Sequence, residues 1–204
     1  MRYRFKALGL VLLAALALIA VVTSSASAAK YTASKYPETM RSSSPAWNVT
    51  LKTEAGNVEC AENLEGTLSA SSTDLTVSPN YWGCSAFGFL EATVTGCKYT
   101  FTEPTGFSDS YTAKMDIVGA CTINTSTCHV TIPIQGALGG VAFTNETASG
   151  DVSVKANVTG IAYTVVTDGF ACPFNGTGSK TGASYVHDVS VTFAPLFGGK
   201  FDIG

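Results

Sequence analysis

Hydrophobic and polar residues alternate one by one along most of this chain. In residues 152–158, Val or Ala occupies every even position and a polar residue occupies every odd one. A period of two is the repeat of a β-strand that buries one face. The same repeat returns in the segments 97–101, 130–134, 161–165 and 189–193. No window of a dozen residues follows the 3.6-residue repeat of a helix, so the pattern predicts strands throughout.

The breaks between these segments contain Gly, Pro and Asn and follow one another at short intervals. Such spacing is typical of antiparallel strands joined by tight turns. We therefore predict an all-β fold, either an antiparallel β-sandwich or a partly closed barrel, formed by a single domain at residues 46–204. Residues 29–45 are rich in Ser, Thr, Lys and Pro and lack periodicity, which predicts a flexible leader before the domain.

The N-terminus has the three-part layout of an export signal. Basic residues in positions 2–6 precede an apolar run at residues 7–22, and Ala26-Ser27-Ala28 supplies the small residues of a cleavage site. The run of 16 residues is shorter than the ~20 that span a membrane. We expect a signal peptide at residues 1–28, no membrane span after its removal, and a protein that is secreted or held at the cell surface.

The charge that remains after the signal is modestly acidic. Nine basic residues then stand against 15 acidic ones, a net charge of −6. Nucleic acid is bound mainly through clustered Lys and Arg, so we do not expect a nucleic-acid partner. All six cysteines follow the signal. An even number of cysteines in an exported chain indicates a disulfide framework.

One disulfide is predicted within a hairpin. If Asn124-Thr125 forms a two-residue turn, Cys121 and Cys128 lie directly opposite each other on the inward face. Directly opposed residues are within disulfide reach. We therefore expect a bond between Cys121 and Cys128.

The remaining four cysteines can pair in several ways. A hairpin turn at Thr95-Gly96 would place Cys97 opposite Val94, which is ten residues, roughly 33 Å of straight strand, from Cys84, and this argues against a bond between the two cysteines. We expect Cys60 with Cys84, and Cys97 with Cys172.

Three sequence motifs carry a resemblance to known proteins. They are Pro-Asn-Tyr-Trp-Gly-Cys-Ser-Ala-Phe-Gly at 79–88, Gly-Cys-Lys-Tyr-Thr-Phe at 96–101 and Ala-Asn-Val-Thr-Gly-Ile-Ala-Tyr-Thr at 156–164. Together they resemble a family of uncharacterised secreted proteins from actinobacteria, over roughly residues 55–185. The resemblance implies a bacterial, exported, cysteine-containing β protein. It implies no activity, ligand or site residue.

Residues with catalytic chemistry are few. The two histidines, His129 and His187, lie on predicted strands, where we expect both to face solvent. Neither belongs to a motif that supplies a nucleophile and an orienting carboxylate. The sequence also lacks the ligand spacings of a metal site. We therefore assign no catalytic residue, no metal and no cofactor, and expect a non-enzymatic protein.

The aromatic cluster of Tyr81, Trp82, Phe87 and Phe89 is the main candidate for binding. Exposed aromatic rings on a β scaffold can stack on sugars, although packing against a disulfide in the core is the commoner use, and we expect core packing here. The first hypothesis is a secreted structural or surface protein. The alternative is an extracellular carbohydrate- or small-ligand-binding module with a cell-envelope or extracellular glycan as partner, and a carboxylate-dependent glycoside hydrolase is the third. The exposure of Trp82 distinguishes the first two.

Overall fold

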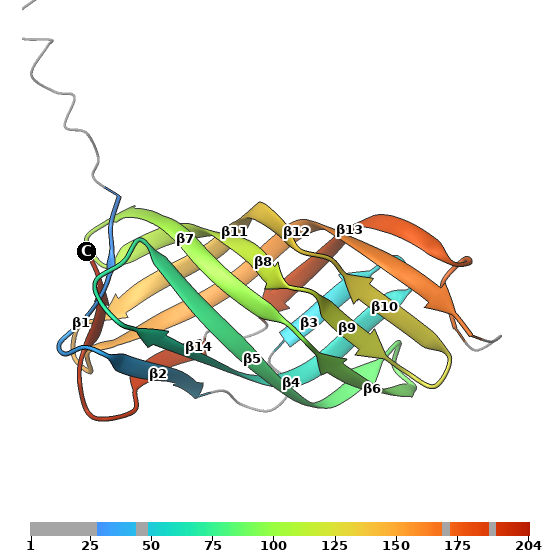
Figure 1. Cartoon of the computed structure of the whole chain (residues 1–204), viewed down its shortest axis with the longest axis horizontal. Coiled ribbons are helices and arrows are strands. Elements are labelled where there is room, and N and C mark those ends of the chain that lie inside the picture. The colour runs from blue at the N-terminus through green and yellow to red at the C-terminus, as the bar shows by residue number, and fades with distance from the viewer. Residues whose placement is uncertain (1–27, 44–48, 169–171, 188–190) are drawn as a thin grey trace, which may run out of the picture.

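The computed structural model describes residues 28–43, 49–168, 172–187 and 191–204, and every regular element in these ranges is a β-strand (Figure 1). In chain order the strands are β1 (Tyr31–Ala33), β2 (Glu38–Ser43), β3 (Val49–Thr53), β4 (Gly56–Leu68), β5 (Asp74–Ala86), β6 (Leu90–Thr95), β7 (Lys98–Phe107), β8 (Ser110–Gly119), β9 (Cys121–Asn124), β10 (Cys128–Ile132), β11 (Gln135–Glu146), β12 (Asp151–Thr167), β13 (Gly178–His187), β14 (Val191–Pro195) and β15 (Phe201–Ile203). The all-β prediction is confirmed.

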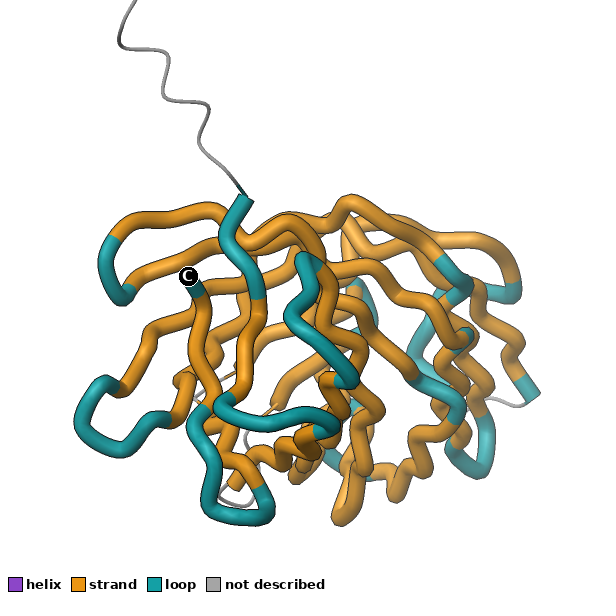
Figure 2. Tube along the Cα trace, turned by 60° about the vertical axis from the view of Figure 1, so that its left-hand side comes forward, coloured by secondary structure: helices purple, strands orange, loops and turns teal. Residues whose placement is uncertain are grey.

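The strands form one large antiparallel sheet that partly closes on itself. Its order is β10-β9-β6-β5-β7-β8-β11-β12-β13-β3-β4-β2-β14, and further pairings join β5 to β4 and β12 to both β10 and β14. The long strands β4, β5 and β12 run along the molecule, while shorter strands complete the ring differently at its two ends (Figures 1 and 2). This is the partly closed barrel of the two predicted architectures.

The core lies inside this ring and follows the alternation of the sequence. In β12, all four even positions from Val152 to Val158 are at most 1% exposed. A β-bulge between Val158 and Ile161 then changes the parity, so that Ile161, Tyr163 and Val165 are the buried residues of the second half. An extra residue in one strand has this effect because it turns the following side chains to the other face.

The predicted flexible leader at residues 29–45 is wrong for the part that the structure describes. Strand β1 pairs with β15 to form a separate two-stranded sheet at one end of the ring, and Tyr31 is fully buried between Phe143 and Phe201. Strand β2 pairs with β4 and β14. Strand β1 has only three residues, and the buried positions of β2 are Glu38, Met40 and Ser42, so neither strand shows an apolar alternation in the sequence. Residues 44 and 45, and the expected signal peptide before Ala28, lie outside the described residues.

The disulfides are Cys60–Cys84, Cys97–Cys121 and Cys128–Cys172, with no free cysteine. The first confirms the prediction. The expected Cys121–Cys128 and Cys97–Cys172 bonds are wrong.

The cause of the error is the turn between β9 and β10. The register pairs Asn124 with His129 and Cys121 with Ile132, so the connection spans four residues instead of two. Cys121 therefore lies across from Ile132, far along the hairpin from Cys128. Three disulfides are typical of an oxidising environment. None of the described residues belongs to a helix long and apolar enough to cross a membrane.

Candidate functional site

A β-bulge in β5 divides the aromatic cluster between the two faces of the sheet. The pairing of β5 with β4 shifts between Glu59 and Ala61, opposite Gly83, whose φ of +60° is a conformation that suits glycine. Before the bulge Tyr81 points inward, and after it Cys84 does. Trp82 consequently lies on the outer face with 41% of its surface exposed, so the prediction that it packs in the core is wrong.

The other three aromatic residues are also divided between the surface and the interior. Phe89, in the turn between β5 and β6, is 65% exposed. Tyr81 contacts the hydroxyl of Tyr99 through its own hydroxyl at 2.7 Å, and Phe87 packs edge-on against Phe174 with ring centroids 5.4 Å apart. The cluster therefore supplies two surface rings, Trp82 and Phe89, and two rings that pack inside.

Two shallow hollows lie beside β5, one on each side of Trp82 along the strand, and Trp82 itself lines neither. One, of about 520 Å³, is lined by residues that include Gly83, Ser85, Phe89 and Glu91. The other, of about 480 Å³, is lined by residues that include Ser78, Asn80 and Lys98. Because Asn80 belongs to one hollow and Gly83 to the other, Trp82 lies between them along the strand. We call this surface the Trp82 platform.

Inside the ring, β4 and β13 bring three polar side chains together in the core. The Tyr185 hydroxyl donates to Glu62 Oε1 at 2.6 Å, and His187 Nε2 lies 3.2 Å from Glu62 Oε2 and 3.0 Å from the Tyr185 hydroxyl. Glu62 is fully buried and His187 is 1% exposed. The prediction that His187 faces solvent is therefore wrong. Its parity with the buried Ala183 and Tyr185 was the signal in the sequence that could have placed it inside.

A cavity of about 30 Å³ lies beside this cluster. Its walls are mainly apolar and include the Cys97–Cys121 disulfide and Cys60, and three tyrosines, Tyr81, Tyr99 and Tyr185, also line it. A space of this size accommodates a water molecule, whereas ligand pockets usually measure hundreds of Å³. The interior is therefore a packed polar cluster, and the surface offers the larger binding area.

Burial raises the pKa of the hydroxyls of Tyr81, Tyr99 and Tyr185 above the ordinary tyrosine value, and the neighbouring Glu62 carboxylate raises each pKa further. Both causes oppose the ionisation of these hydroxyls inside the ring. These three phenols stay neutral in the folded protein at pH values where an unfolded chain would begin to ionise.

Stability is therefore expected to fall as the pH rises above about 10, the value near which unfolded tyrosines ionise. A raised pKa in the folded state contributes stability that is present in full below the unfolded pKa and is lost above it, by up to about 1.4 kcal/mol per pH unit for each tyrosine. Urea unfolding at pH 8 to 11 measures the effect. Tyr185→Phe should show a shallower alkaline loss, and an equal slope would contradict the role of this hydroxyl.

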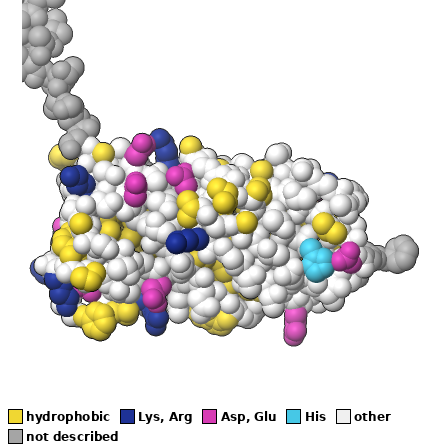
Figure 3. Space-filling model, in the orientation of Figure 1, with side chains coloured by type: hydrophobic (Ala, Val, Ile, Leu, Met, Phe, Trp, Pro, Cys, Tyr) yellow, Lys and Arg dark blue, Asp and Glu magenta, His cyan; other side chains and the backbone are white. Residues whose placement is uncertain are grey.

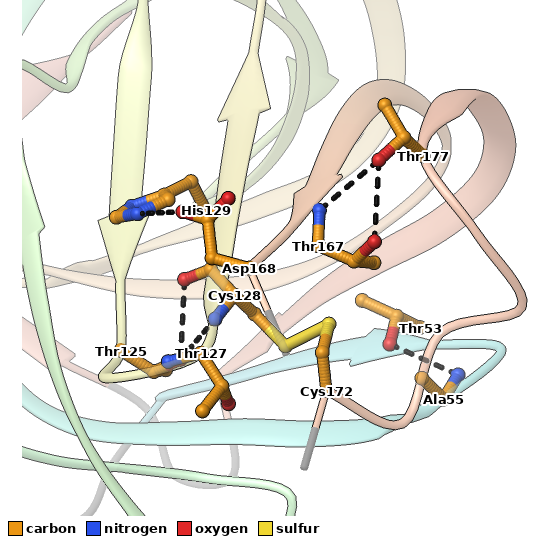
Figure 4. Close-up of a disulfide and its surroundings, with 10 residues drawn as sticks. All are labelled: Thr53, Ala55, Thr125, Thr127, Cys128, His129, Thr167, Asp168, Cys172 and Thr177. Carbon is orange, nitrogen blue, oxygen red and sulfur yellow. Dashed lines mark hydrogen bonds and ion pairs between the residues drawn. A yellow bond between two sulfur atoms is a disulfide. The ribbon is translucent and has the colours of Figure 1, made fainter. Parts of the chain in front are cut away.

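His129 lies on the surface, as predicted, beside the Cys128–Cys172 disulfide (Figure 4). Its Nδ1 is 2.7 Å from Asn124 Oδ1 and its Nε2 is 2.8 Å from Asp168 Oδ2, with the imidazole about half exposed. Both ring nitrogens are engaged by these oxygens. The contact with Asp168 joins β10 to the chain that follows β12.

In the described part of the chain, no group of three or more His, Cys, Asp or Glu side chains is arranged to hold a metal ion. No family model, no curated protein and no solved structure matches this chain. The Trp82 platform is therefore the candidate site with the clearest chemistry.

Proposed function

We propose that this protein is a secreted carbohydrate-binding protein and that the Trp82 platform is its binding surface. The observation that carries the proposal is the exposure of Trp82 on the outer face of β5, between two hollows. An indole ring offers a large, rigid apolar face, and sugar rings present apolar C–H faces between their hydroxyls, so the two can stack.

The surroundings of the indole supply polar partners for sugar hydroxyls. Asn80 and Ser78 lie on one side of it along β5, and Ser85 and Glu91 line the hollow on the other side. Ala61 lies opposite Trp82 in the strand pairing and is only 3% exposed although it belongs to the outer face, so its neighbours shield it. This combination of an apolar ring and a few polar groups is typical of a site that orients a polar ligand.

The compartment forms part of the proposal. Three disulfides fit an oxidising environment outside the cell. The expected signal peptide ends next to the folded domain, where the backbone N–H of Ala29 already donates to the carbonyl of Pro104 at 3.0 Å. The resemblance to secreted actinobacterial proteins also supports an extracellular location. A glycan of the cell envelope or of the surroundings is the partner that this location offers.

Substitution of Trp82 by Ala tests the proposal. The variant should lose glycan binding at least about tenfold, because a central aromatic anchor carries much of the energy of a binding surface. Its free energy of unfolding should change little, since the side chain is exposed. A glycan array, followed by titration calorimetry on the best ligand and by urea unfolding, measures both quantities.

Phe107→Ala is the matched control, because Phe107 is 88% exposed at the turn between β7 and β8 and contributes to neither hollow. It should alter neither binding nor stability. The proposal is refuted if Trp82→Ala binds glycans as the wild type does, or if the wild type binds none. The second outcome would favour the hypothesis of a structural surface protein.

A further inference from the structure

The strand register assembles a row of hydroxyl side chains that the sequence conceals. Five directly opposed residues cross the outer face of β6, β9, β10, β12 and β13 in that order, namely Thr95, Thr122, Thr131, Thr164 and Ser179. All five are exposed or half-buried. We call them the hydroxyl row. With neighbouring strands about 4.8 Å apart, the row extends about 19 Å across the sheet.

The hydroxyls of this row have no hydrogen-bond partner among the side chains and backbone groups of the described residues. Other threonines of the outer face are paired instead, as in Thr39–Thr67 at 3.1 Å, Thr76–Thr100 at 2.9 Å and Thr105–Thr112 at 3.4 Å. A paired hydroxyl has already used part of its capacity to donate and accept. The hydroxyl row retains that capacity for a partner outside the chain.

The row begins on the strand that also borders the Trp82 platform. On β6, Glu91, Thr93 and Thr95 point outward, and Glu91 lines the hollow that contains Phe89. Thr95 is four residues from Glu91, or about 13 Å along the strand. A chain-like ligand that occupies the hollow can therefore continue onto the row without leaving the outer face of the sheet.

The charge of this face restricts the kind of ligand. The row itself contains no charged residue, and at the right of Figure 3, over β6, β9 and β10, the view shows a histidine and scattered acidic side chains. The basic side chains visible in this view lie toward the other end of the molecule. An anionic polymer would need clustered Lys or Arg here, and a cationic one would need clustered carboxylates. The methyl and hydroxyl groups of threonine suit the C–H and O–H groups of an uncharged sugar.

From this arrangement we infer that the hydroxyl row extends the Trp82 platform into a surface for a long, neutral polysaccharide. The inference rests on the proposed function and adds the class of ligand. Short oligosaccharides occupy the platform alone, whereas a polymer also contacts the row and gains affinity from it. Each hydrogen bond to the row contributes a few-fold in affinity.

The test is a combined variant with Thr95→Val, Thr122→Val, Thr131→Val and Thr164→Val. Valine keeps the shape and the strand preference of threonine and has a methyl group in place of the hydroxyl. The matched control replaces Thr105 and Thr112 by Val, which removes both partners of a cross-strand pair that lines neither hollow of the platform. The probes are soluble glucan, mannan and xylan, together with the disaccharide of each polymer, and titration calorimetry measures the affinities.

The row variant should bind the preferred polymer at least about tenfold more weakly and its disaccharide as the wild type does, and the control should match the wild type with both probes. Polymer affinity within about twofold of the wild type would overturn the inference, as would tighter binding of polygalacturonate or chitosan than of any neutral polymer. If the combined variant does not fold, Thr131→Tyr provides a steric block at the middle of the row with the same expected result.

The Trp82→Ala variant separates the two proposals. If it abolishes binding of both probes while the row variant binds normally, the proposed function stands and the inference fails. If Trp82→Ala leaves both affinities unchanged, the proposed function itself fails.

Discussion

Reduction of the three disulfides is expected to unfold the protein at 37 °C. On the loop-entropy estimate, the Cys128–Cys172 bond, with a sequence separation of 44, contributes about 4 kcal/mol, and each of the other two, with a separation of 24, contributes about 3.4 kcal/mol. Together these values are comparable to the entire stability of an ordinary domain, about 5 to 15 kcal/mol. Circular dichroism during heating, with and without a dithiol reductant, measures the loss.

Cysteine variants also test which cysteines are joined. The variant with Cys97→Ala and Cys121→Ala removes one bond, whereas the variant with Cys121→Ala and Cys128→Ala removes two and should lose about twice as much stability. If Cys121 were bonded to Cys128, the second variant would lose only one bond. Similar losses in the two variants, or a non-reduced peptide map that links Cys121 to Cys128, would contradict the structure.

The strands themselves were predictable because their signal is local. The alternation in residues 152–158 specifies both the strand and its buried face, and the structure buries those even positions. Closure of the sheet could not be predicted in this way, because it depends on pairings such as His129 with Val166 that join segments far apart in the chain. A local pattern gives no information on such partners, so the choice between sandwich and barrel had to remain open.

The errors at the candidate site share one physical cause, a change of register by one or more residues. At Gly83 one extra residue reverses the parity of β5, so that Cys84 is buried although Trp82, two residues before it, points outward, and a turn of four residues instead of two moves Cys128 away from Cys121. A period of two makes every side chain sensitive to such a shift. The sequence did indicate that the four aromatic residues could not all be buried, because Tyr81 and Trp82 are adjacent and a regular strand cannot direct both of them into the core.

The buried cluster was missed for another reason. A carboxylate and an imidazole are rarely buried unless they are paired, so His187 was expected outside. Its partner Glu62 is 125 residues away in the sequence, and only the long-range order of β13, β3 and β4 brings the two together. Polar residues on the inward parity of a strand are thus a sign of a distant polar partner.

Replacement of Glu62 by Ala is expected to cost about 3 to 5 kcal/mol of unfolding free energy, because it removes the acceptor of the Tyr185 hydroxyl and one of the two partners of His187 Nε2 inside the core. Glu62→Gln should cost less, since the amide oxygen can still accept from Tyr185 and the side-chain volume is kept. Urea unfolding at neutral pH, with the midpoint and slope both measured, gives these values.

Glu59→Ala is the control, because Glu59 lies on the same strand but is exposed on the outer face, where substitutions usually change stability by no more than about 0.5 kcal/mol. A loss for Glu62→Ala no greater than that for Glu59→Ala would show that the carboxylate is dispensable. A large loss for Glu62→Ala that Glu62→Gln largely restores would instead establish that hydrogen bonding, more than charge, holds β4 and β13 together around the interior.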